Sequence, residues 1–135
     1  MTFRRRDVLT KKTKALPATA SSVYTDSLDL RRDSSGGHGD HMADVELLVS
    51  APALTNAQLG NAHTMKYTVQ HSHNDSVWED LYTDEITQTG AGAGAAAATK
   101  RFRLPTNVYR YVRVKATASA ADDASDASMT AELYY

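Results

Sequence analysis

The chain shows its fold class most clearly in Thr64-Met-Lys-Tyr-Thr-Val-Gln70, where apolar and polar residues alternate without a break. Tyr111–Ala116 and Ser128–Tyr134 alternate in the same way. Strict alternation indicates a strand with one buried and one solvated face. Weaker strand candidates, separated by turn-rich segments, are residues 23–30, 45–49, 77–82 and 100–104. Some seven short strands without an amphipathic helix predict an all-β fold, either an antiparallel β-sandwich or a barrel.

Length and composition narrow the class of protein further. The chain has 135 residues, a formal net charge of -1 and no cysteine. This length favours one domain, and the lack of cysteine excludes disulfides and thiol chemistry. No window approaches the roughly 20 consecutive apolar residues of a membrane span, and no apolar segment follows the basic N-terminus as in a secretory signal. We therefore expect a single soluble β domain without a membrane segment.

Basic residues are concentrated in the first fourteen positions, which contain six of them and only one acidic residue, Asp7. The remaining residues are acidic overall, and residues 1–21 contain too few apolar side chains to offset their ordering entropy. We predict an extended basic N-terminal arm over residues 1–21 and a β-sandwich domain over residues 22–135. The pattern leaves three roles open for the arm: a solvated tail, a segment that orders on an acidic protein surface, or a nucleic-acid contact.

Two motifs resemble ligand sites without completing them. His71-Ser-His-Asn-Asp75 has the spacing of the front of a two-metal hydrolase motif, but Ser76 stands where that motif continues with a histidine. The same segment suits a turn after the strand at residues 64–70. Gly90-Ala-Gly-Ala-Gly-Ala95 fits a dinucleotide fingerprint, but polar residues precede it where a buried strand is required. We expect no metal, no cofactor and no enzyme activity.

A second basic set lies in the C-terminal third of the chain. Alternation places these side chains opposite the apolar ones of two strands that we expect to be neighbours: Arg101, Arg103, Arg110, Arg113 and Lys115. Such a face would pair with a neighbouring subunit or another protein, bind nucleic acid, or keep the sheet soluble. The sequence leaves these three readings open.

One family resemblance links several of these segments. A Gly/Ala-rich run from Gly90 to Ala98 leads into a strand that ends in Leu104-Pro105, and Arg110-Tyr-Val-Arg113 follows. Upstream, Tyr24-Thr-Asp-Ser-Leu-Asp-Leu30 and the segments 44–49 and 67–77 fit the same pattern. Over residues 22–135 the chain resembles the small capsid cement, or decoration, proteins of tailed bacteriophages.

The resemblance implies a jelly-roll-like β-sandwich that forms a homotrimer on the outer surface of a virion, binds the major capsid protein and stabilises the capsid against DNA pressure. It implies no cofactor, metal or catalytic residue. Independently of the resemblance, the lack of a long apolar segment argues against a membrane as partner, and the net charge of -1 argues against nucleic acid. Under this hypothesis the arm contacts the capsid through Phe3, Arg4, Arg5, Arg6, Val8, Leu9, Lys11, Lys12 and Lys14.

Three other functions remain open from the sequence. They are another small virion component such as a head–tail connector or minor tail protein, a single-stranded nucleic-acid-binding β module, and a carbohydrate-binding or hydrolytic module.

Overall fold

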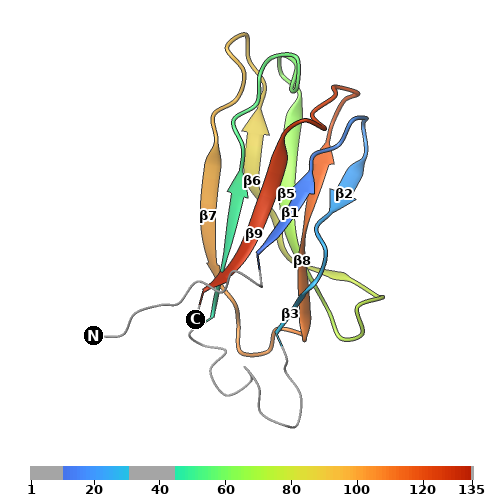
Figure 1. Ribbon diagram of the computed structural model, residues 1–135, viewed down its shortest axis with the longest axis vertical. Helices are drawn as coiled ribbons and strands as arrows, with labels where there is room; N and C mark the ends of the chain where they lie inside the picture. Colours follow the sequence, from blue (N-terminus) through green and yellow to red (C-terminus); the bar gives the residue numbers. More distant parts are fainter. Residues whose placement is uncertain (1–10, 31–44, 135) are drawn as a thin grey trace, which may run out of the picture.

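The computed structural model describes residues 11–30 and 45–134, and this part of the chain contains strands and no helix (Figure 1). No helix in it is therefore long and apolar enough to cross a membrane. The strands are β1 (Lys12–Ala15), β2 (Ser22–Tyr24), β3 (Leu28–Asp29), β4 (Glu46–Ala51), β5 (Thr64–Ser72), β6 (Glu79–Thr89), β7 (Ala98–Arg103), β8 (Tyr111–Ala118) and β9 (Ser128–Tyr134).

The strands form two antiparallel sheets that pack face to face as a jelly-roll-like β-sandwich (Figure 1). The first sheet has the order β1-β9-β4-β7, and the second has the order β2-β8-β5-β6, with β3 also paired to β8. The predicted all-β antiparallel sandwich is confirmed. Strands that follow each other in the chain do not always pair: β6 belongs to the second sheet and β7 to the first.

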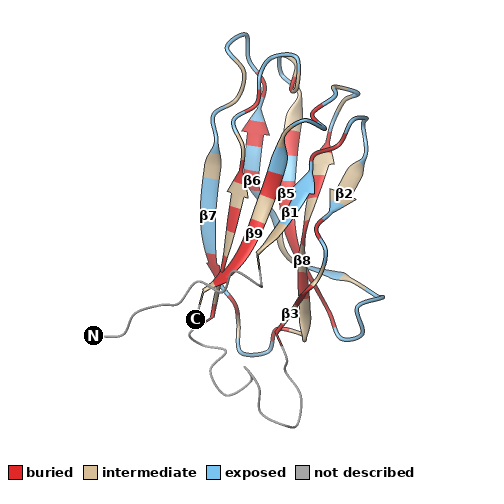
Figure 2. Ribbon diagram, in the orientation of Figure 1, coloured by how far each residue is buried: buried red, intermediate tan, exposed pale blue. Residues whose placement is uncertain are grey.

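The core lies between the sheets and is built from the apolar members of the alternating strands (Figure 2). In β8 every second residue is buried, and in β9 Met129, Ala131 and Leu133 point inward. The buried faces of both sheets form one continuous apolar cluster. The alternation predicted from the sequence therefore sets which side of each strand faces solvent, and with it which side chains are available for binding.

One polar network lies within this core. The buried Tyr67 hydroxyl donates a hydrogen bond of 2.7 Å to Gln88 Oε1, and burial raises the pKa of Tyr67. Gln88 Nε2 donates to the backbone carbonyls of Pro52, at 2.7 Å, and Ala96, at 2.9 Å. Because a buried polar group without a partner is costly, this network holds two connecting loops against β5 and β6.

The basic N-terminal segment differs from the predicted arm. Lys12–Ala15 is strand β1, which pairs with β9 at the edge of the first sheet, and Leu16 behind it is buried. From Lys12 on, the segment belongs to the sandwich, while residues 1–10 lie outside the described residues. Backbone pairing with β9, rather than burial of side chains, brings β1 into the sheet, which is why the side-chain pattern gave no sign of it.

The glycine-rich run after β6 is held closely by its backbone. The Gly90 N–H donates to the His63 carbonyl at 2.8 Å, and the Ala62 N–H donates to the Gly90 carbonyl at 2.9 Å. Gly94 has a φ of 85°, in the left-handed region that glycine tolerates best. This connection therefore crosses from the second sheet to the first along a defined path.

Candidate functional site

The outer face of the second sheet carries an arginine between two aromatic rings. The guanidinium carbon of Arg113, on β8, lies 4.0 Å from the ring centroid of Tyr24, on β2, and 4.1 Å from that of Trp78, just before β6. Gln70 and Asp80 complete the group through side-chain hydrogen bonds. We call Tyr24, Gln70, Trp78, Asp80 and Arg113 the Arg113 site.

Strand register places these side chains in line. Because Val112 and Val114 are fully buried, Arg113 between them points outward. Gln70 of β5 lies directly opposite Arg113, and Asp80 of β6 lies directly opposite Gln70. Residues opposite each other in an antiparallel pair share a face, so the three side chains form a row across the sheet.

The turn between β5 and β6 brings Trp78 to this row. Asn74 Oδ1 accepts hydrogen bonds from the backbone N–H groups of Ser76, at 3.0 Å, and Val77, at 2.9 Å. Asp75 has a φ of 58°, which aspartate tolerates better than most residues. The Asn74 side chain thus shapes the turn in the way that asparagine often does, and Trp78 follows at a fixed position.

Hydrogen bonds fix the polar part of the site. Arg113 Nε donates to Gln70 Oε1 at 2.9 Å, and Gln70 Nε2 donates to Asp80 Oδ1 at 2.9 Å. The Asp80 carboxylate accepts only, so it orients the amide with its oxygen toward the guanidinium. The site is therefore arranged before any ligand arrives.

The electrostatics of the site centre on Arg113. Burial lowers the pKa of Arg113, while the Tyr24 phenol and the Asp75 carboxylate act in the opposite direction. An arginine side chain stays protonated in proteins at neutral pH. Its two cation–π contacts each contribute about 0.5–2 kcal/mol. The site consequently presents a fixed positive charge framed by rings.

A second aromatic group lies near the Arg113 site, at the end of β5 that contains Gln70 and His71. Tyr109 stacks on His71, with ring centroids 4.0 Å apart, and on His73, with centroids 3.5 Å apart. The Tyr109 backbone N–H donates to His71 Nδ1 at 3.3 Å, and burial lowers the pKa of His71. A shallow pocket of about 430 Å³ is lined by His73, Asn107, Val108, Tyr109 and Arg110.

This stack separates the two histidines of the motif at residues 71–75. One aromatic ring can stack on another only through its two faces, so His71 and His73 lie on opposite sides of Tyr109. In this arrangement they do not converge on one cation. Among residues 11–30 and 45–134, no group of three or more metal-ligating side chains is suitably placed for an ion.

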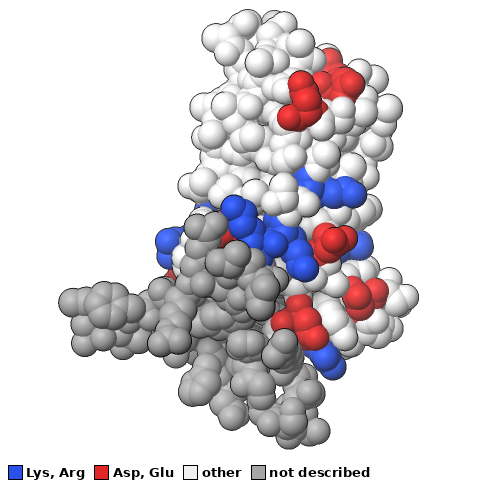
Figure 3. Space-filling model, viewed as in Figure 1, with Lys and Arg blue, Asp and Glu red and all other residues white. Residues whose placement is uncertain are grey.

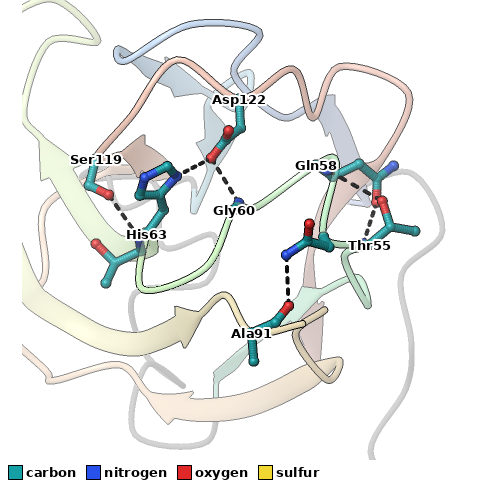
Figure 4. A network of polar contacts seen from close by, with 9 residues as sticks. Thr55, Gln58, Gly60, His63, Ala91, Ser119 and Asp122 are labelled. Atoms are coloured by element: carbon teal, nitrogen blue, oxygen red, sulfur yellow. Dashed lines mark hydrogen bonds and ion pairs between the residues drawn. The ribbon is translucent and has the colours of Figure 1, made fainter. Parts of the chain in front are cut away.

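At the opposite end of the sandwich, polar contacts join the connecting loops (Figure 4). His63 Nδ1 lies 2.6 Å from Asp122 Oδ2, and the Gly60 N–H donates to the same oxygen at 2.9 Å. The hydrogen bond from Gly60, followed by that with His63, lowers the pKa of Asp122. The Ser119 hydroxyl accepts from the Thr64 N–H at 2.8 Å and is used there as a structural partner. These hydrogen bonds therefore hold the loop that precedes β5 against the loop that follows β8.

The second predicted basic set does not form one face. Arg101 and Arg103 lie on β7 of the first sheet, whereas Arg113 and Lys115 lie on β8 of the second, and Arg110 precedes β8. Figure 3 shows basic side chains gathered across the middle of the face that the first sheet turns to the viewer. The prediction of neighbouring strands was wrong because alternation tells which side of a strand is wet but not which sheet the strand joins.

Two of these arginines already have acidic partners. Arg110 contacts Asp29 through two hydrogen bonds of 2.9 Å, from Nε to Oδ1 and from Nη2 to Oδ2. Arg101 lies 3.5 Å from Glu46 and 4.8 Å from the ring centroid of Tyr134. Both contacts stabilise the surface of the sandwich itself.

The residues predicted to contact a partner through the arm divide into two groups. Lys11 lies 3.5 Å from Glu132 on the outer face of the first sheet, and Lys12 and Lys14 belong to β1. The others lie outside the described residues: Phe3, Arg4, Arg5, Arg6, Val8 and Leu9.

Sequence reasoning missed the two rings of the Arg113 site. Trp78 is the only tryptophan in the chain and follows a polar turn, which was an available signal for an exposed aromatic residue. Tyr24 carried no signal of its own, although the residue is 40% exposed. Their proximity depends on the order β2-β8-β5-β6, which the sequence does not reveal.

Comparison with known proteins gives one family. The model of the F5/8 type C domain matches residues 44–133. No curated protein matches the sequence.

Several solved structures are similar at low identity. The CBM22-1 xylan-binding domain of Paenibacillus barcinonensis Xyn10C is 11% identical with a TM-score of 0.47, over 98% of this chain and 95% of that one. The Cowpea mosaic virus top component is 8% identical with a TM-score of 0.44, over 98% of this chain and 85% of that one. The xylan-binding module CBM15 is 9% identical with a TM-score of 0.43, over 99% and 97%.

The family match overturns the interpretation as a phage capsid cement protein, together with the major capsid protein and the homotrimer expected with it. The virion alternative fails on the same finding, and no comparison tests the expected virion location separately. The motifs behind the resemblance were short. A Gly/Ala-rich connection and an alternating Arg-Tyr-Val-Arg strand suit many antiparallel sandwiches, because they reflect turn chemistry and a half-buried strand rather than a shared partner.

Proposed function

The chain belongs to the F5/8 type C domain family, and from that premise we propose that it is a non-catalytic carbohydrate-binding module whose ligand occupies the Arg113 site. One observation carries the proposal: Tyr24 and Trp78 flank a fixed guanidinium on an open sheet face.

The chemistry of this surface matches that of a sugar. A pyranose ring has apolar C–H faces and a rim of hydroxyl groups, so it suits a site that combines flat apolar rings with fixed hydrogen-bonding groups. Tyrosine and tryptophan supply rigid apolar faces with a polar tip. The Gln70 amide and the Arg113 guanidinium supply oriented polar groups beside them. Binding sites of small ligands commonly pair apolar lining with a few placed polar groups.

The sole tryptophan gives a direct test. Because Trp78 belongs to the site, its fluorescence reports a ligand there without a label. The full chain would be titrated with soluble xylan, galactan, mannan and acidic pectic polymers, and binding checked by affinity electrophoresis in gels that contain each polymer. Xylan is included because two of the similar structures are xylan-binding modules by name. We expect at least one polymer to change Trp78 emission and to retard the chain.

Variants locate the ligand. Tyr24→Ala should weaken binding at least tenfold, which corresponds to about 1.4 kcal/mol, and Trp78→Ala should abolish retardation in the gel. Tyr134→Ala is the matched control, since Tyr134 also has an arginine over its ring but lies on the first sheet. Equal effects of Tyr24→Ala and Tyr134→Ala would place the ligand elsewhere. Failure of every polymer to bind would refute the carbohydrate function.

A further inference from the structure

Arg113 has an unused hydrogen-bonding edge. Its Nε donates to Gln70 at 2.9 Å, and within the described part of the chain its two Nη atoms have no acceptor. No side-chain nitrogen or oxygen of these residues is both buried and unpaired. The two Nη atoms are therefore not fully buried, and they form the unpaired edge of the guanidinium.

The rest of the guanidinium already has partners within the chain. Its central carbon lies 4.0 Å from the ring centroid of Tyr24 and 4.1 Å from that of Trp78, so two aromatic rings pack against it. Gln70 takes the Nε side. The edge that carries the two Nη atoms lies in the guanidinium plane and offers a ligand two parallel N–H bonds. A planar two-oxygen anion fits this fork best.

A neighbouring arginine, Arg110, already binds a carboxylate of this chain through two parallel hydrogen bonds. Arg110 receives both oxygens of Asp29 through two bonds of 2.9 Å. Arg113, by contrast, forms no ion pair with a described acidic residue: Asp80 is bonded to Gln70, and Asp75 acts only at longer range. The desolvated charge of Arg113 thus lacks the close carboxylate that Arg110 has.

We propose that the Arg113 site selects sugars that carry a carboxylate, as uronic acids do, and that the carboxylate binds the Nη1–Nη2 edge of Arg113 between Tyr24 and Trp78. This inference rests on the proposed carbohydrate binding and names the ligand class. A neutral hydroxyl would accept one bond from the fork, whereas a carboxylate accepts two and also compensates the charge.

The experiment compares two forms of one polymer. Polygalacturonic acid and its methyl ester have the same backbone, but the ester lacks the charge. We expect the free acid to bind at least tenfold more tightly than the ester at equal ionic strength, as measured by Trp78 fluorescence.

Variants separate the effect of the two parallel N–H bonds of Arg113 on binding from the effect of its positive charge. Arg113→Lys keeps the cation but cannot donate two parallel bonds, so affinity for the free acid should fall at least tenfold while affinity for the ester changes little. Lys115→Gln is the control, because it removes a full charge two residues away on the same outer face, and we expect less than a threefold change. Asp75→Asn removes a competing negative charge and should strengthen binding of the acid two- to fivefold.

Far-UV circular dichroism would confirm that each variant is folded, and Asp75→Asn tests the charge even if Arg113→Lys is unstable. Equal binding of acid and ester would overturn the inference and leave the carbohydrate function standing. Binding of no polymer at all would overturn both. Displacement of the polymer by inorganic phosphate, but not by monomeric galacturonate at the same concentration, would show a general anion site and would also overturn the inference.

Discussion

Replacing Gly90 with alanine would put a methyl group where the structure has backbone. The added Cβ would lie 2.0 Å from the Gly60 carbonyl oxygen and 2.5 Å from that of Leu59, against an ordinary contact of about 3.5 Å. Relief requires the segments to separate, which breaks the bonds of Gly90 to His63 and Ala62. Overpacking costs about 1–3 kcal/mol and each lost backbone bond about 0.5–1.5 kcal/mol. The expected loss is about 2–6 kcal/mol, a large part of the roughly 5–15 kcal/mol of a typical domain.

Urea denaturation followed by Trp78 fluorescence measures this loss. With a slope of about 2 kcal/mol per molar urea, the midpoint should fall by about 1–3 M. Gly92→Ala is the matched control, because a Cβ there meets nothing within 4 Å, and it should leave stability unchanged within about 0.5 kcal/mol or raise it slightly. If the two variants unfold at the same urea concentration, the close packing of Gly90 is not what holds this connection.

Three further outcomes follow from polar groups. Tyr67→Phe leaves the buried Gln88 Oε1 without its donor and should cost about 1–3 kcal/mol in urea denaturation; an unchanged midpoint would contradict the network. The pKa of His71 is lowered by burial, so the unfolded chain takes up the proton first and stability should fall as the pH drops through about 6.5. His71→Asn should flatten that slope between pH 7 and pH 5, and an equal slope would assign it to other groups. The pKa of Asp122 is held low, so its contribution is present above about pH 3.9 and is lost as the pH falls through the lower folded value. Asp122→Asn should therefore lower the melting temperature at pH 7 in calorimetry but not at strongly acidic pH, and a constant difference would argue against a stabilising role of the charged carboxylate.

The strands that the sequence predicted best share one structural property. The alternating segments at residues 64–70, 111–116 and 128–134 became β5, β8 and β9, which each have a partner strand on both sides. An interior strand of a sandwich buries every second side chain, so its pattern is complete. Alternation therefore detects the interior of each sheet.

Edge strands were harder to predict for the opposite reason. β1 was expected as part of an arm, because Lys12-Thr-Lys-Ala15 contains almost no apolar residue. β6 was expected at residues 77–82 but extends over Glu79–Thr89, with a register shift against β5 that interrupts its alternation. Backbone pairing and a bulge decide these segments, and neither leaves a clear side-chain pattern.

The candidate site could be predicted only in part. Arg113 was identified as an outward cation from its place between two valines, and the structure agrees. It was grouped with Arg101, which lies on the other sheet, while Tyr24 and Trp78 were not connected to it. The site joins β2, β6 and β8, which are distant in the chain, so its composition depends on strand order rather than on any local motif.

The position of β9 makes the first sheet depend on one strand. β9 is the last strand of the chain, yet it lies between β1 and β4 in the first sheet. Among the described strands β1 pairs only with β9 in that sheet, so its place in the sheet depends on β9. Removal of residues 128–134 would therefore leave β1 without its partner strand and expose an unpaired β4 edge prone to aggregation.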